Sequence, residues 1–155
     1  MHRLTSLSLF LLLAMIAAAV GGQFTGGEWY QSMRQPAWSP PALVMALVWA
    51  MAYVMMAVAA WMVWDTRRGL ARVALAWWVL QLLLGIGWSW VFFGMHRPGW
   101  ALIILAAWWL VVLVVIRTFR SVKPAASRLV GPVAIWLMFC WVLGFVQWRL
   151  NGGGI

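Results

Sequence analysis

The sequence predicts an all-α fold, a single bundle of five transmembrane helices in a chain of 155 residues. Of these residues 66% are hydrophobic and 8% are charged, which leaves too few charges to cover a soluble surface. Five apolar stretches are each long enough, at about 20 residues, to cross a bilayer. The fifteen tryptophans agree with this, because tryptophan anchors helices at the water–lipid interface. The length suits one domain, which we expect to cover 1–155.

The apolar stretches fix the expected order of helices and loops. We expect helices near residues 4–22, 42–64, 73–95, 99–117 and 128–150. The first stretch follows Arg3 and resembles a signal peptide, but four further spans already predict a membrane protein, and we interpret it as a retained helix. The one long connection, 23–41, ends in two prolines, which fix φ and start the second helix.

The basic residues are divided unequally between the two ends of the predicted bundle. Eight lie on the side of the N-terminus, namely Arg3, Arg67, Arg68, Arg72, Arg117, Arg120, Lys123 and Arg128. Arg34, Arg97 and Arg149 lie on the other side. The asymmetry predicts a cytoplasmic N-terminus and an external C-terminus, as in a bacterial inner membrane. We expect no nucleic-acid partner, because these charges flank apolar runs and form no basic face.

Residue types for catalysis or metal binding are scarce. Glu28 and Asp65 are the acids of the chain, and Cys140 is its one cysteine. His2 and His96 are too few and too peripheral for a metal centre. We therefore predict no metal site, no disulfide, no covalently bound cofactor and no conventional catalytic constellation. Whether the protein is an enzyme stays open.

Three of the predicted helices carry an aromatic stripe that also holds small or polar residues. Spacings of three and four residues place the members of each stripe on one helix face. The stripes are Trp49, Tyr53 and Met56; Gln81, Gly85, Trp88 and Phe92; and Trp136, Cys140 and Gly144. Polar groups avoid lipid, and glycine beside an indole leaves room. The stripes predict a cavity open toward the outer leaflet, with Trp136 nearest its floor; for any single tryptophan, helix or lipid packing is the alternative.

Other tryptophans lie close to the predicted ends of the spans. We expect these to be interface anchors. They are Trp29, Trp61, Trp64, Trp77, Trp78, Trp100 and Trp148.

The long loop contains the most specific pattern in the chain. It reads EWYQSMRQPAWSPP over 28–41 and is followed by VWAMAY at 48–53. Further matches in order are Gln81 and Trp88, FFG at 92–94, GWAL at 99–102, Pro132 and Trp136, and Trp148, Arg149 and Asn151. Over about residues 24–151 the sequence resembles the translocator protein family, also called TspO or tryptophan-rich sensory proteins.

This resemblance implies a five-helix membrane bundle, often a homodimer, that binds porphyrins, sterols and benzodiazepine-like drugs under a lid formed by the first loop. Carried over by motif, Tyr30, Trp38 and Pro40 belong to the lid side. The implied walls are Trp49, Tyr53, Trp88, Trp136 and Cys140, to which the stripes add Gly85, Phe92 and Gly144. In bacterial relatives the tryptophans that match Trp49 and Trp136 are linked to light-dependent breakdown of protoporphyrin, so these two are the candidate catalytic residues.

The sequence also departs from the family pattern. Gly85 and Gly144 stand where the family has polar residues, so we expect a larger, less polar pocket. A drug that loses one buried hydrogen bond loses about 1–3 kcal/mol. Of the sterol-recognition pattern, Leu143, Phe145 and Arg149 remain, with phenylalanine in place of tyrosine, and we expect little sterol binding.

The leading prediction is therefore a membrane receptor or carrier for a planar hydrophobic ligand, a tetrapyrrole such as protoporphyrin. Indole faces would stack on the ring, and Arg34 would pair with its carboxylates at the mouth. A small transporter is one alternative, but its usual intramembrane ionisable group is absent from the five spans. A scaffold protein is another, with Gly85 and Ser89 as a small-residue seam for helix association.

Overall fold

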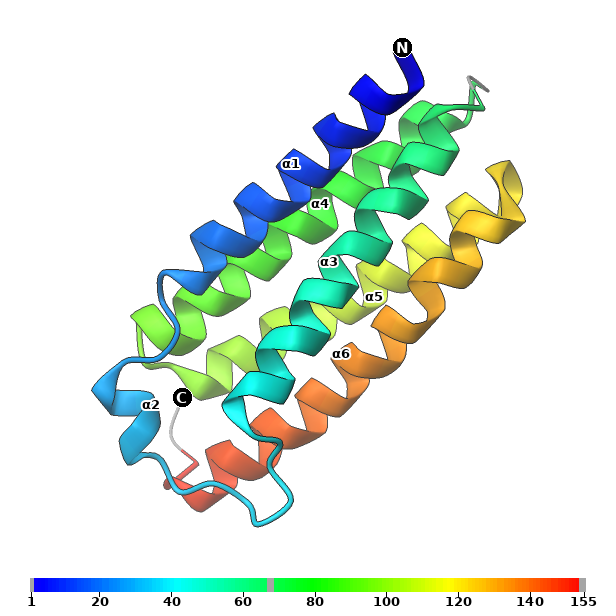
Figure 1. Ribbon diagram of the computed structural model, residues 1–155. Coiled ribbons are helices and arrows are strands. Elements are labelled where there is room, and N and C mark those ends of the chain that lie inside the picture. Colours follow the sequence, from blue (N-terminus) through cyan, green and yellow to red (C-terminus); the bar gives the residue numbers. More distant parts are fainter. Residues whose placement is uncertain (1, 67–68, 154–155) are drawn as a thin grey trace.

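The computed structural model describes residues 2–66 and 69–153, and within this part it contains helices, turns and loops but no strand. Five long helices form one bundle, and a short helix and a π-helical turn lie at one end of it (Figure 1). The elements are α1 His2–Gly22, α2 Glu28–Ser32, α3 Ala42–Trp64, α4 Ala71–Ser89, η1 Trp90–Gly94, α5 Pro98–Val122 and α6 Pro124–Leu150.

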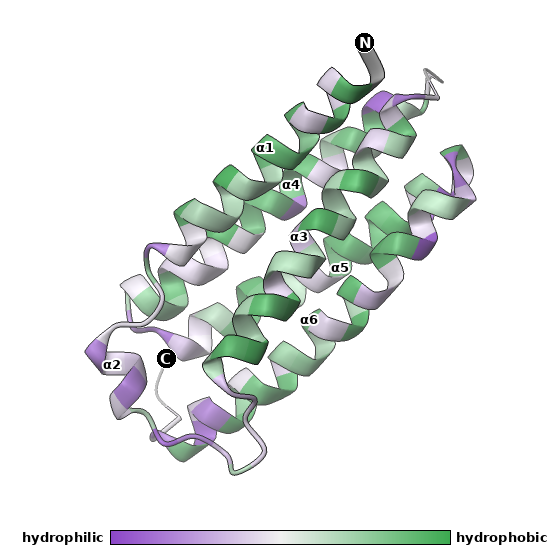
Figure 2. Cartoon of the chain, in the orientation of Figure 1, coloured by the Kyte–Doolittle hydropathy of each residue, from purple (hydrophilic) through white to green (hydrophobic). Residues whose placement is uncertain are grey.

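The prediction of an all-α membrane protein is confirmed. Five helices of the described chain are long and apolar enough to cross a bilayer, and their apolar residues cover the length of the bundle (Figure 2). The last two spans are longer than predicted: α5 continues to Val122 and α6 begins at Pro124. Arginines such as Arg117 and Arg120 ended the apolar run in the sequence, although long basic side chains extend to the interface and leave a helix intact.

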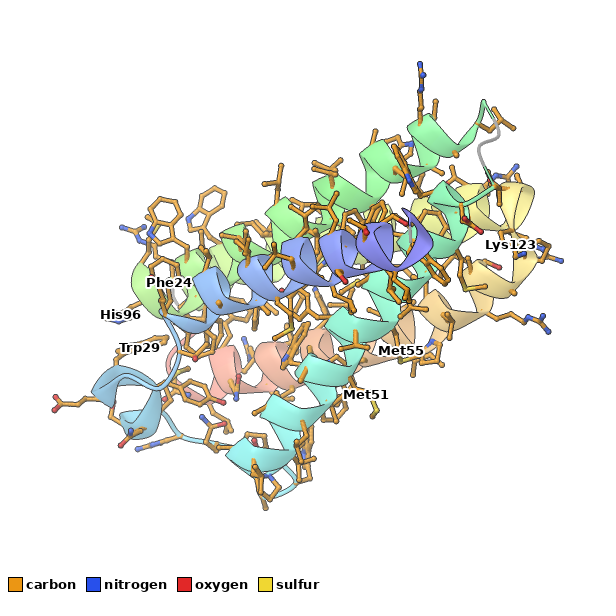
Figure 3. All side chains as sticks on the ribbon, turned by 45° about the horizontal axis from the view of Figure 1, so that its top comes forward. Phe24, Trp29, Met51, Met55, His96 and Lys123 are labelled. Atoms are coloured by element: carbon orange, nitrogen blue, oxygen red, sulfur yellow. The ribbon has the colours of Figure 1, made fainter. Side chains whose placement is uncertain are left out.

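The helices pack in an order that places α5 between α4 and α6. Helix α1 packs against α3 and α4, and α3 also packs against α6. The first turn of α1, the end of α3 and the α5–α6 connection lie at one end of the bundle, whereas α2 and the last turn of α6 lie at the opposite end (Figure 1). Lys123 lies at the first end and His96 at the second (Figure 3). Arg67 and Arg68, which contributed to the predicted orientation, are outside the described residues.

Small residues hold the α1–α4 contact together. The Ser89 hydroxyl donates to the Gly21 carbonyl oxygen at 2.6 Å, and Ser89 is 5% exposed. Small side chains let transmembrane backbones approach closely enough for such bonds. Gly85, one turn earlier, packs on Trp108 of α5. The two residues proposed as a seam for association with another protein therefore face neighbouring helices of their own chain.

Trp78 corrects the expectation that tryptophans near span ends are interface anchors. It is 1% exposed, donates from Nε1 to the Met56 carbonyl oxygen at 3.0 Å, and meets Phe10 edge to face at 5.4 Å. Trp64 and Trp100, by contrast, are about half exposed, as anchors should be. Distance from a span end indicates depth but not which face of the helix a residue occupies.

Candidate functional site

The chain reverses between α4 and α5 through a widened turn. In η1 the Met95 amide donates to the Trp90 carbonyl oxygen at 2.9 Å, an i to i+5 bond that places one extra residue in the turn. Gly94 allows the Trp90 ring to approach closely, because a Cβ would stand 2.9 Å from it. His96 then adopts a left-handed φ of 56°, and Pro98 starts α5.

Helix α2 lies against this turn and contacts it through two aromatic side chains. On one face Trp29 stacks on His96, with centroids 4.5 Å apart and planes 19° apart (Figure 3). On the other, Tyr30 meets the Phe93 ring edge to face at 5.2 Å. Met33, just after α2, is 8% exposed and packs between the same elements. The predicted loop therefore contains a short helix with aromatic contacts to the bundle.

Two polar residues, Gln147 in α6 and Asn151 just after its end, hold the segment that follows α2. The Asn151 side chain accepts from the Arg34 amide at 2.9 Å and donates to the Arg34 carbonyl oxygen at 3.0 Å. Gln147, 3% exposed, donates from Nε2 to the Gln35 side-chain oxygen and to the Tyr30 hydroxyl at 3.4 Å. Sequence reasoning overlooked Gln147, although an isolated amide in an apolar run is a signal for an interior position.

A small inner cavity lies under Tyr30. Its volume is about 40 Å³, well below the roughly 300–1,000 Å³ of ordinary ligand pockets. It is lined by Tyr30, Met45, Trp88, Phe92, Phe93, Leu102, Leu105, Cys140, Leu143, Gly144 and Gln147. Five predicted site residues are in this set, from the loop, α4, η1 and α6. A ligand larger than a few atoms would require the surrounding side chains to move.

Four indoles meet next to the cavity, with Trp49 in their centre. Trp49 stacks on Trp108 with centroids 5.5 Å apart and planes 15° apart, and on Trp88 at 6.0 Å and 29°. Trp136 meets it edge to face at 6.2 Å, and Tyr53 lies 6.2 Å away. We call Trp49, Tyr53, Trp88, Trp108 and Trp136 the aromatic cluster. Offset and edge-to-face pairs of this kind are the favoured aromatic arrangements.

Trp108 is a member of this cluster that sequence reasoning did not assign. Leu105 and Val112, three residues before and four residues after it, lie on the same face of α5 and are fully buried. That spacing is a usable signal, but Trp108 and Trp109 are adjacent in an apolar run, so the sequence does not show which of the two faces the interior. Trp109 faces α6, where its Nε1 donates to the Ala134 carbonyl oxygen at 3.0 Å.

The extra room expected at Gly85 is filled by a neighbouring side chain. A Cβ on Gly85 would stand 2.8 Å from two ring atoms of Trp108 and 3.2 Å from the Tyr53 oxygen. A Cβ on Gly144 would stand 3.3 Å from Leu102. Gly85 therefore permits the close packing of Trp108 and does not enlarge the pocket, whereas Gly144 lines the inner cavity beside Leu102.

Two buried hydrogen-bond donors of this region have no partner in the described structure. They are Nε2 of Gln81 and Nε1 of Trp136. The Gln81 oxygen, in contrast, accepts from Trp108 Nε1 at 3.0 Å. An unpaired buried donor costs about 1–3 kcal/mol, and each can bind an acceptor on a ligand.

Two predicted lid residues lie away from the inner cavity. Trp38 is 50% exposed and meets Phe139 edge to face at 6.0 Å. Phe139 in turn stacks on Trp136 at 5.1 Å, so Trp38 contacts the outer side of the cluster through one intervening ring. Pro40 is half-buried in the segment before α3. Neither residue lines the cavity in this conformation.

A second, wider hollow of about 400 Å³ lies beside Trp29 and Ser32 of α2. It is lined by Trp29, Ser32, Met33, His96, Arg97, Pro98, Trp148 and Asn151. It shares no lining residue with the inner cavity. Among the described residues no three His, Cys, Asp or Glu side chains come close enough to hold a metal ion.

The fold and this arrangement define a class: a multi-pass membrane protein of five helices with a tryptophan-rich interior covered by its first loop. Comparison with known proteins identifies the family. The pattern of the TspO/MBR family matches residues 9–149, and the chain belongs to this family.

Individual relatives match nearly the whole chain. The protein CrtK of Rhodobacter capsulatus is 32% identical over 97% of this chain and 95% of its own length. The tryptophan-rich sensory protein of Cereibacter sphaeroides is 33% identical over 92% and 89%, respectively. The human translocator protein is 33% identical over 93% of this chain and 89% of its own length.

Proposed function

We propose that the protein is a membrane receptor or carrier that binds a planar hydrophobic tetrapyrrole, such as protoporphyrin, among the indoles under α2. The observation that carries this proposal is the convergence of Trp49, Trp88 and Trp136 from three helices beside a cavity covered by Tyr30. Flat indole faces suit a flat aromatic ring. The names of the relatives, a sensory protein and a translocator, support receptor or carrier roles.

Binding requires the cavity to open. The Gln147 bonds to Tyr30 and Gln35 help to hold it closed at the loop end. Movement of α2 would also require release of the Asn151 bonds to Arg34 and of the ring contacts between α2 and η1. The carboxylates of the ligand would remain near Arg34 and Arg97, because charged groups belong at the water interface and pair strongly with guanidinium. The unpaired Nε1 donor of Trp136 would face an acceptor on the ring.

Titration of the purified protein with protoporphyrin tests the proposal. We expect tryptophan fluorescence to be quenched with a Kd in the micromolar range. Trp88→Leu should weaken binding about tenfold, because stacking on one aromatic side chain is worth about 1–3 kcal/mol. Trp64→Leu, at the opposite end of the bundle, should leave the affinity unchanged. Unchanged emission of the wild-type protein at micromolar protoporphyrin would refute the proposal.

We further propose that bound protoporphyrin is broken down in light, with dioxygen as oxidant and Trp49 and Trp136 as reacting neighbours. The two indoles touch each other, so a reactive species formed at one is within reach of the other. Trp49→Phe combined with Trp136→Phe is expected to slow light-driven loss of porphyrin absorbance at least tenfold when ligand is saturating. A dark sample and Trp109→Phe are the controls. Equal rates in the double variant and the wild type would exclude a role for these indoles.

The proposed placement has the N-terminus in the cytoplasm of a bacterial cell, the C-terminus outside, and a homodimer as the functional unit.

The residues that remain of the sterol-recognition pattern lie apart in the structure. Leu143 lines the inner cavity, whereas Phe145 is 39% exposed and Arg149 is exposed. These three residues therefore give no common surface for a sterol, in line with the low expectation for that ligand. A transporter or a scaffold remains the alternative if no planar ligand binds.

A further inference from the structure

Trp108 is held in the way that a binding site holds a planar ligand. It is 1% exposed, and one face lies against Trp49 at 5.5 Å and 15°. Its ring edge fits against Gly85, where a Cβ would stand only 2.8 Å away. Its Nε1 donates to the side-chain oxygen of Gln81 at 3.0 Å. A stacking face, a space without a side chain and a matched acceptor are the elements of a site for a flat ring with an N–H group.

We propose that this space is a latent binding site for a planar heteroaromatic ring, which the chain fills with its own Trp108, and that Trp108 thereby limits how deep a ligand can lie. Leu105 lines the inner cavity and precedes Trp108 by one turn of α5. Trp108 does not itself line the cavity; it follows the lining residue Leu105 by one turn and bonds to Gln81 on its other side. The limit on ligand depth rests on the proposed function, but the latent site does not.

Truncation of Trp108 should open the latent site. An empty apolar space of roughly 150 Å³ is large enough to bind benzene in other proteins, and removal of an indole leaves a space of that order. Gly85, Trp49 and the Gln81 oxygen would line it. A ligand that binds only the folded protein raises the unfolding temperature in proportion to its occupancy.

The first experiment compares indole and benzofuran as added probes on the full chain in detergent micelles. Indole at millimolar concentration is expected to raise the unfolding temperature of Trp108→Ala and not that of the wild type. Benzofuran has the same shape without the N–H and should bind Trp108→Ala about tenfold more weakly, because it leaves the Gln81 oxygen unpaired. Trp109→Ala is the matched control, since its indole lies on the same helix but faces α6, and it should not respond.

Two further variants keep this test decisive. Gly85→Leu combined with Trp108→Ala refills the space from the α4 side and should abolish the response to indole. If Trp108→Ala is not helical, Trp108→Leu with pyrrole as the probe replaces it, because a partial truncation leaves a smaller space. A folded variant whose unfolding temperature does not respond to its probe would overturn the proposal.

The second experiment separates the latent site from the proposed function. Protoporphyrin should bind Trp108→Ala about tenfold more tightly than the wild type, and Trp109→Ala should match the wild type. Equal affinity of Trp108→Ala and the wild type would overturn the limit on ligand depth. If neither binds protoporphyrin while Trp108→Ala binds indole, the tetrapyrrole proposal fails and the latent site stands.

Discussion

Replacement of Trp78 with alanine is expected to lower the free energy of unfolding by about 3–5 kcal/mol, as for other buried tryptophans. Trp78 is 1% exposed, packs on Phe10 and bonds to the Met56 carbonyl oxygen. Its removal leaves a cavity where α1, α3 and α4 meet. The packing loss applies in lipid as in water, because the lost contacts are with neighbouring side chains.

Denaturant unfolding in mixed micelles, followed by far-UV circular dichroism, measures this loss. Trp78→Phe keeps a ring in place and gives up the hydrogen bond, so we expect a smaller loss of about 1–2 kcal/mol. Trp100→Ala is the control for an interface tryptophan, since Trp100 is 49% exposed, and it should change the free energy by less than about 1 kcal/mol. Equal effects at Trp78 and Trp100 would show that the burial of Trp78 is not what stabilises the bundle.

The contrast between these two tryptophans shows what the sequence could predict. Run length and composition gave the five spans, because crossing a bilayer requires about 20 apolar residues whatever their neighbours are. Helical spacing also placed Trp49, Trp88 and Trp136 on interior faces, and the structure brings them together. In an almost uniformly apolar chain, however, no polar face marks the side that meets lipid, so Trp78 could not be separated from true anchors.

The other differences between the sequence-based predictions and the structure arise from contacts between helices. The space beside Gly85 depends on what α5 presents to α4, and that neighbour is Trp108. A single sequence gives no rule for pairing these two positions. The helix α2 has five residues, too few for a periodic pattern, and it is placed by Trp29, Tyr30 and Met33 against the η1 turn. Local signals therefore predicted the elements, and tertiary packing decided the shape of the site.

Trp136→Phe is expected to leave the ligand-free protein at least as stable as the wild type while weakening protoporphyrin binding about tenfold. The Trp136 ring contacts Trp49 and Phe139, and phenylalanine keeps most of those contacts. What it removes is a buried N–H without an acceptor, which costs the wild type about 1–3 kcal/mol. That relief offsets the roughly 1 kcal/mol expected for the smaller ring.

Trp136→Phe should weaken the complex with protoporphyrin, although it leaves the ligand-free protein stable. A bound tetrapyrrole presents ring nitrogen acceptors, and loss of one hydrogen bond to them corresponds to about 1.4 kcal/mol, or a factor of ten in Kd. Trp109→Phe should have the opposite effects on stability and affinity, because the Trp109 Nε1 of the wild type is bonded to the Ala134 carbonyl oxygen. That variant should lose about 1 kcal/mol of stability and keep its affinity. Unfolding temperatures and protoporphyrin titrations on both variants test the pair. A Trp136→Phe protein that is destabilised and binds normally would show that this N–H has a structural partner and no part in ligand binding.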